Sequence, residues 1–116
     1  MIDLPAGLAG DEPGAENEAL AVAARRELEE EAGWSAERME VVATCPSSPG
    51  LTSEIVTILR AQGMRRIGDG GGVAGEGITV HAPLVAEAPG WLAARAASGA
   101  LIDPKVYAGL WFARPG

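Results

Sequence analysis

The chain has 116 residues, with 9 Lys and Arg against 16 Asp and Glu, which gives a formal net charge of −7. Its single cysteine excludes an internal disulfide, and it contains no run of about 18 apolar residues that could span a membrane. Residues 1–17 show no basic stretch followed by an apolar run, so we expect no secretory signal. Nucleic-acid binding needs clustered Lys and Arg, which this acidic chain does not offer. We therefore expect a cytoplasmic domain that binds neither membranes nor nucleic acid.

Periodicity and breaker residues predict strands and helices separated by loops rich in Gly and Pro. The expected strands are residues 1–4, Arg38–Thr44, Glu54–Ala61 and Ile78–Leu84. The expected helices are Glu18–Ala32 stopped by Gly33, Pro89–Ser98 stopped by Gly99, and a last helix from the Asp103-Pro104 start signal to about Ala113. The resulting order, β–α–β–β–β–α–α, indicates an α/β or α+β fold.

A run of glycines separates the last two expected strands. Seven glycines lie between Gly63 and Gly77. Because glycine loses the most backbone freedom when it becomes ordered, we expect the segment Gly68–Gly77 at its centre to be a flexible lid.

An acid-rich run closes the first expected helix, and most such runs are solvated faces. On a helix with about 100° per residue, however, Glu27 and Glu31 fall on its apolar stripe. That stripe is formed by Leu20, Ala24 and Leu28. Like charges four residues apart repel by roughly 0.2–0.5 kcal/mol, and the end of a helix disfavours anions. The sequence therefore predicts that something compensates these two inward-facing carboxylates.

A hard divalent cation would supply that compensation. Glu30 falls beside Glu27 on the predicted helix, so three carboxylates on adjacent turns could share one ion. Oxygen ligands favour Mg²⁺, with Mn²⁺ as the alternative. Arg26 lies four residues before Glu30 and could hold the cluster in position.

These residues resemble the signature of the Nudix hydrolases, G-x5-E-x7-R-E-U-x-E-E-x-G-U, in which U is a bulky apolar residue. Glu18, seven intervening residues and then the segment Arg26–Trp34 match that pattern position for position. The leading glycine corresponds to Gly7, which leaves ten residues before Glu18 instead of five. Further segments are similar to the ADP-ribose pyrophosphatases of this family, namely Asp3–Gly7, Ser48–Glu54, Glu76–Val80 and Gly99–Asp103.

The resemblance implies a Nudix-type α/β/α sandwich with a mixed sheet, formed by one partial domain over residues 1–116. It also implies Mg²⁺-dependent hydrolysis of the pyrophosphate bond of a nucleoside diphosphate derivative, with ADP-ribose split into AMP and ribose 5-phosphate. Family members carry further strands before the position of Gly7, so we expect an N-terminally truncated domain. Unpaired sheet edges invite association, and we expect a homodimer, which strand exchange could complete.

The resemblance assigns roles to particular residues. The implied metal ligands are Glu27, Glu30, Glu31 and a backbone carbonyl of Ala6 or Gly7. The implied catalytic residues are Arg26, which orients the carboxylates, Glu30, and Glu76 or Glu54 as the general base. The implied substrate contacts are Gly7, Ser48, Gly50 and Glu54.

Several interpretations stay open at this point. The substrate could be another nucleotide, such as a dinucleoside polyphosphate or NADH. The chain could also be a truncated, non-catalytic module that senses a nucleotide or binds a partner. Glu54 could be only a charge at a strand edge and Glu76 only a loop charge, since most charged side chains are simply exposed.

Overall fold

A computed structural model describes residues 1–6, 16–72 and 77–114. In this part of the chain the fold is α+β, with three α-helices and a two-stranded antiparallel sheet. The residues form two compact units, one from Pro5 to Val80 and one from Met1–Leu4 together with His81–Gly116.

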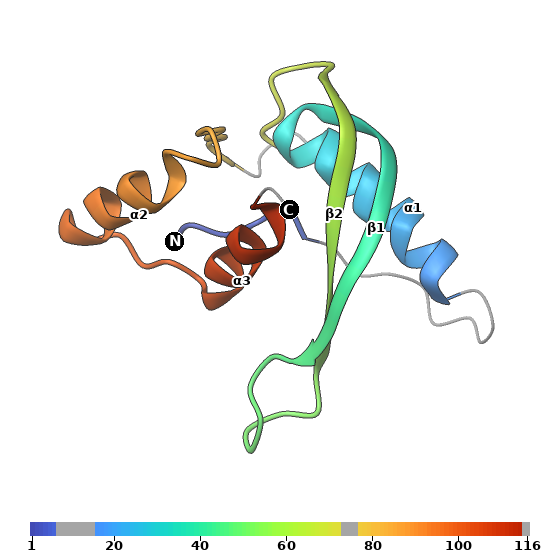
Figure 1. The fold of residues 1–116 in the computed structure, drawn as a ribbon, viewed down its shortest axis with the longest axis horizontal. Helices are drawn as coiled ribbons and strands as arrows, with labels where there is room; N and C mark the ends of the chain where they lie inside the picture. Colours follow the sequence, from blue (N-terminus) through green and yellow to red (C-terminus); the bar gives the residue numbers. More distant parts are fainter. Residues whose placement is uncertain (7–15, 73–76, 115–116) are drawn as a thin grey trace. The chain divides into compact units, whose positions relative to one another are not determined.

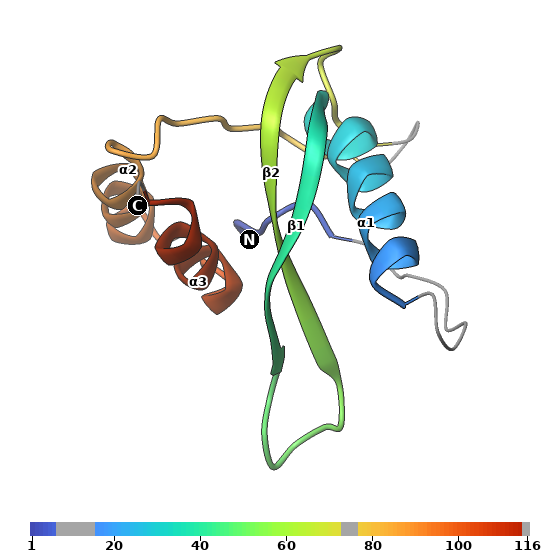
Figure 2. The same cartoon turned by 45° about the vertical axis from the view of Figure 1, so that its right-hand side comes forward.

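The first helix and a long β-hairpin make up the Pro5–Val80 unit (Figures 1 and 2). Its elements are α1 (Glu16–Glu27), a π-helical turn η1 (Leu28–Ala32), β1 (Trp34–Pro46) and β2 (Ile55–Arg66). The strands pair from Trp34–Arg66 at one end to Pro46–Ile55 at the other, with an irregularity between Val41 and Ala43. The buried apolar side chains of the unit are Ala23 of α1, Ala36 of β1 and Ile58 of β2.

The second unit is built from α2 (Ala88–Ala97) and α3 (Pro104–Ala113). Its buried side chains are Ala88, Leu92 and Val106. The first residues of the chain belong to it, because Ile2 forms an isolated parallel bridge with Ile102. The N–H of Ile2 donates to the carbonyl of Leu101 at 2.8 Å, and the N–H of Asp103 donates to the carbonyl of Ile2 at 2.9 Å.

Most of the expected elements are confirmed, with shifted bounds. The two hairpin strands are longer than expected, because the ladder continues past the apolar residues into polar ones at both ends. Gly33 ends the first helical segment with φ 76°, as expected for a left-handed C-cap glycine. The last helix begins at Pro104 after the Asp103 cap, also as expected.

Two expectations are wrong in the part of the chain that the structure describes. Ile78–Leu84 is not a strand, and residues 1–4 contribute only the single bridge at Ile2. The predicted mixed sheet is therefore replaced by a purely antiparallel pair. The physical reason is that a β-branched run becomes a strand only when a neighbouring strand satisfies its backbone groups, and the described residues place none beside Ile78–Leu84. No described helix is long and apolar enough to cross a bilayer.

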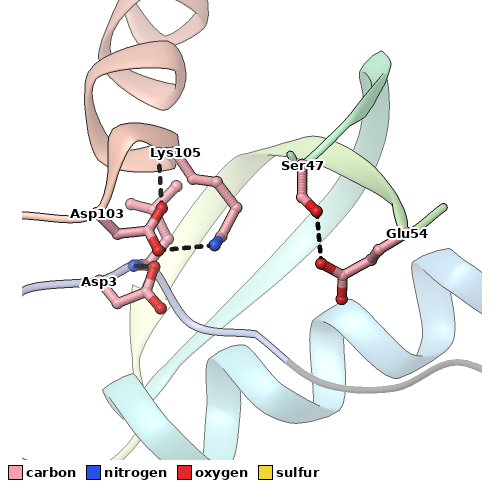
Figure 3. Close-up of polar contacts among 6 residues, drawn as sticks. Asp3, Ser47, Glu54, Asp103 and Lys105 are labelled. Atoms are coloured by element: carbon pink, nitrogen blue, oxygen red, sulfur yellow. Dashed lines mark hydrogen bonds and ion pairs between the residues drawn. The ribbon is translucent and has the colours of Figure 1, made fainter. Parts of the chain in front are cut away.

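Asp103 shows how local chemistry fixes one element of the second unit (Figure 3). Its Oδ1 accepts a hydrogen bond from the backbone N–H of Lys105 at 2.8 Å, and its Oδ2 lies 2.9 Å from the Lys105 ammonium. The backbone hydrogen bond, followed by that ammonium, holds the pKa of the Asp103 carboxyl below its usual value. The charged form of Asp103 is thus the one that caps α3 best.

We predict that Asp103→Ala lowers the free energy of unfolding by about 1 kcal/mol at neutral pH, the usual effect of losing an N-cap. Asp103→Asn keeps an acceptor for the Lys105 N–H but removes the charge. Because the folded pKa is lowered, the charge-dependent stabilisation is present above the ordinary Asp pKa and is lost as pH falls through the folded pKa. Urea unfolding followed by circular dichroism should therefore show the gap between wild type and Asp103→Asn closing in acid. A gap that stays constant with pH would contradict this assignment.

Candidate functional site

The candidate site lies where the first helix ends and changes its winding. Glu27 is the last residue of α1, and Glu30 and Glu31 belong to the π-helical turn η1. A π turn closes i→i+5 hydrogen bonds and holds more residues than an α turn. The expectation of one regular α-helix to Ala32 is therefore wrong for its last five residues. Short π segments are frequent at functional sites.

The change of winding decides how the three carboxylates are placed. Glu27 and Glu31 are half-buried, and the Glu27 side chain is 20% exposed. Glu29, which helical periodicity predicts on the opposite face, is half-buried as well. Glu30 is exposed. In an α-helix, three residues nearly complete one turn and bring Glu30 back beside Glu27. In a π-helix, each residue advances by a smaller angle, so three residues fall further short of a full turn and Glu30 lies farther from Glu27 around the helix axis. The predicted position of Glu30 beside Glu27 is not what η1 produces.

Glu31 is joined to the segment that precedes the first helix. The backbone N–H of Ala6 donates to Oε2 of Glu31 at 2.9 Å, across 25 positions of sequence. Ala6 was expected near the metal through its carbonyl, and the structure brings it to Glu31 through its amide. Gly7, the alternative carbonyl and an implied substrate contact, lies outside the described residues.

Arg26 forms an ion pair with its neighbour Glu27, with an N–O distance of 3.6 Å. The expected partner was Glu30. The arginine side chain is 56% exposed, so solvent screens this pair and its contribution to stability is small. Arg26 can still influence the position of the Glu27 carboxylate.

The backbone carbonyls at the end of this helix are capped by the segment that follows the hairpin. The Gly33 carbonyl accepts from the N–H of Ile67 at 2.8 Å and of Gly68 at 3.2 Å. The N–H of Gly71 donates to the Glu31 carbonyl at 2.8 Å, and the N–H of Gly72 donates to the Glu30 carbonyl at 2.9 Å. Terminal carbonyls of a helix lack partners within the helix, and the glycine segment supplies them. In the structure Gly68–Gly72 therefore lies against the end of the helix, and the flexibility expected of this segment stays a prediction.

Glycine is required there because two stretches of backbone touch. A Cβ atom on Gly70 would lie 2.6 Å from the carbonyl oxygen of Glu31 and 2.6 Å from the carbonyl carbon of Ala32. A Cβ atom on Gly33 would lie 2.7 Å from the backbone nitrogen of Gly70. Both glycines also have positive φ, 76° at Gly33 and 71° at Gly70. The density of glycine in the sequence could have suggested this close approach, although it does not reveal the partner.

The donor chemistry of this site suits a hard divalent cation, because it consists of carboxylate oxygens. Two of the three carboxylates are half-buried, and the Ala6 N–H already fixes the direction of one of them. Among the residues that the structure describes, however, no three Asp, Glu, His or Cys side chains converge on one point. The turn thus carries carboxylates of the kind that could bind such a cation, but the described residues do not bring three of them together.

The other predicted site residues are elsewhere. Ser48, Gly50 and Glu54 lie in the turn of the hairpin, at the end opposite to η1 (Figure 1). The 13 residues of β1 that lie between span on the order of 40 Å at about 3.3 Å per residue. The structure therefore does not bring these residues to the glutamates. Glu76 lies outside the described residues.

Glu54 has a local hydrogen-bonding role at the base of that turn (Figure 3). The Ser47 hydroxyl donates to its Oε1 at 2.6 Å, and the Ser47 N–H donates to its backbone carbonyl at 3.1 Å. The N–H of Glu54 donates in turn to Oγ1 of Thr52 at 3.2 Å. These contacts agree with the interpretation of Glu54 as a charge at a strand edge that also closes its own loop.

No family model, no curated protein and no solved structure matches the chain.

We predict that Glu31→Ala releases the Ala6 amide. The hydrogen bond from Ala6 is made to a charged acceptor, and such bonds are stronger than neutral ones. The Ala6 amide should therefore exchange with solvent several-fold faster in Glu31→Ala than in wild type, as measured by NMR. Glu31→Gln keeps a side-chain acceptor and should show a smaller effect. The matched control is Glu29→Ala, which removes a neighbouring carboxylate of the same turn. Equal rates in wild type and Glu31→Ala would show that the contact does not form in solution.

Proposed function

We propose that the chain is a Nudix-type hydrolase that splits the pyrophosphate bond of a nucleoside diphosphate derivative with the help of Mg²⁺ or Mn²⁺. ADP-ribose is the proposed substrate, and AMP and ribose 5-phosphate are the proposed products. The proposal combines the match of Glu18 and Arg26–Trp34 to the family signature with the surroundings of Glu27 and Glu31.

One observation carries most of the weight. Glu27 and Glu31 are half-buried residues at the end of a helix, and the Glu31 carboxylate accepts a hydrogen bond from the Ala6 N–H. Anions at a helix C-terminus are unfavourable, and removing carboxylates from water costs further free energy. A fold that tolerates both penalties at one place usually does so for function. Cation binding is the simplest function that turns these penalties into an advantage.

The residues that would hold the cation are Glu27 and Glu31, with Glu30 joining them from its exposed position. When bound, a divalent cation supplies neutralisation of the pyrophosphate charge and a water of lowered pKa. The protein's own contribution is to orient these ligands. The Ala6 N–H directs Glu31, and the Arg26 guanidinium lies beside Glu27.

A second function is favoured by a specific observation. The three carboxylates do not converge in the described residues, and the implied substrate contacts Ser48, Gly50 and Glu54 lie at the far end of the hairpin. Both facts argue against an assembled catalytic site and suit a non-catalytic module that senses a nucleotide or binds a partner. The two functions differ in whether product forms, so one experiment separates them.

We predict that the purified chain releases AMP from ADP-ribose in the presence of Mg²⁺ and that a chelator abolishes the reaction. Glu31→Gln should lower the rate at least about tenfold, because even residues that only support a metal ligand cost 10- to 100-fold when they are changed. Glu29→Gln is the matched control and should retain the wild-type rate. Chromatography of the nucleotides measures all three proteins.

The outcomes assign the function. Hydrolysis that depends on Mg²⁺ and on Glu31 supports the enzyme, and a panel with NADH and a dinucleoside polyphosphate identifies the preferred substrate. Binding of ADP-ribose in a calorimeter without any product supports the non-catalytic module. Hydrolysis that is equal in wild type and Glu31→Gln would show that the acidic turn is not the reactive site.

A further inference from the structure

We propose that the segment Gly68–Gly72 is a conformational clasp that holds the turn Leu28–Ala32 in its π-helical form, and that release of the clasp returns this turn to α-helix. The proposal concerns the backbone of the Pro5–Val80 unit and does not rest on the proposed function. It would nevertheless determine which glutamates share a face of the helix.

The sequence of the turn does not itself favour a π-helix. Leu28–Ala32 reads Leu-Glu-Glu-Glu-Ala, and each of these residue types is a good α-helix former. π-Helical turns are rare, because i→i+5 bonding is less favourable than the α pattern. Something outside the turn must therefore stabilise it. The contacts that reach it from elsewhere include the Ala6–Glu31 hydrogen bond and the two backbone hydrogen bonds donated by Gly71 and Gly72. The amides of Ile67 and Gly68 donate to Gly33, the residue that follows the turn.

The backbone bonds are specific to the present form of the turn. The amides of Gly71 and Gly72 donate to two successive carbonyls, those of Glu31 and Glu30. A change from π to α winding would rotate both carbonyls and shift them along the axis. Those carbonyls could not keep the same two donors at 2.8 and 2.9 Å. The hydrogen bonds of the clasp and the π-helical winding of the turn are therefore gained or lost together.

The glycine backbone makes the clasp possible and also keeps it marginal. Gly70, Gly71 and Gly72 all have positive φ, 71°, 98° and 81°. Residues with a side chain rarely adopt such values, and ordering three glycines costs more conformational entropy than ordering other residues. A few hydrogen bonds at the molecular surface oppose that cost. This balance is what a reversible clasp requires.

Release of the clasp would change the positions of Glu30 and Glu31 relative to Glu27. In the clasped form Glu30 is exposed and displaced round the helix from Glu27. In an α-helix, residues three and four apart are neighbours on one face, so Glu30 and Glu31 would both lie next to Glu27. The clasp therefore keeps apart carboxylates that the α form would gather.

Three glycine substitutions test the clasp, and their surroundings differ in one respect at a time. Gly70→Ala adds a Cβ where φ is positive and backbone lies 2.6 Å away. Gly71→Ala has the same kind of φ, but its Cβ would meet only the Ile78 carbonyl oxygen at 3.5 Å. Gly68→Ala is the control in the same segment, because its Cβ would meet no atom within 4 Å and its φ is not positive.

Amide hydrogen exchange and ¹³Cα chemical shifts of the metal-free protein, measured by NMR with a chelator present, provide the readout. In Gly70→Ala we expect the Gly71 and Gly72 amides to exchange at least about tenfold faster than in wild type. The ¹³Cα shifts of Leu28–Ala32 should change with them, while the amides of the β1–β2 ladder keep their protection. Gly68→Ala should match wild type, and Gly71→Ala should fall between the two.

Several results would overturn the proposal. Gly70→Ala could show wild-type exchange and unchanged shifts at Leu28–Ala32, or it could release the two amides while the turn keeps its wild-type shifts. If Gly70→Ala does not fold, Gly71→Ala decides the question by the same two criteria. Since no cation or substrate is present, failure of the clasp leaves the proposed hydrolase untouched, and a chain without hydrolytic activity leaves the clasp untouched.

Discussion

The end of the first helix is the constraint around which the Pro5–Val80 unit is organised. Carbonyls without partners inside a helix must find donors elsewhere or remain in water. Here the donors are backbone amides that directly follow the hairpin, so the length and direction of β1 and β2 are tied to the point where the helix ends. Strand β1 leads away from the end of the helix, and β2 returns the chain to it, so that the amides after β2 can donate to the helix carbonyls. Three acidic side chains sit on the turn that this contact fixes.

Local signals in the sequence were enough to predict several elements. The Asp103-Pro104 pair marks the start of α3, because an Asx cap and a proline at the first helical position act within a few residues of each other. Gly33 marks the end of the first helical segment for a similarly local reason. The hairpin strands follow from their β-branched and alternating residues. Ile78–Leu84 has the same strand chemistry and is not a strand, because pairing depends on a partner that the residues themselves do not specify.

The candidate site was predicted in part. The half-burial of Glu27 and Glu31 follows from helical periodicity, although Glu29, predicted on the outer face, is half-buried as well. The position of Glu30 does not follow from periodicity, because it depends on a change of winding stabilised by residues about 40 positions away in the sequence. The role of the glycine segment was missed for a related reason. A high glycine content indicates conformational freedom, and it does not reveal that this freedom is used to bring two backbones together.

The bridge between Ile2 and Ile102 has a consequence for how the chain folds. The unit formed by α2 and α3 needs the first few residues, yet about a hundred positions separate the two sides of that bridge. The entropy lost on closing a loop grows with its length, and contacts of this separation slow folding. During synthesis the α1 and hairpin segment leaves the ribosome in one piece and can fold early. Ile2 can form this bridge only after the segment around Ile102 has emerged.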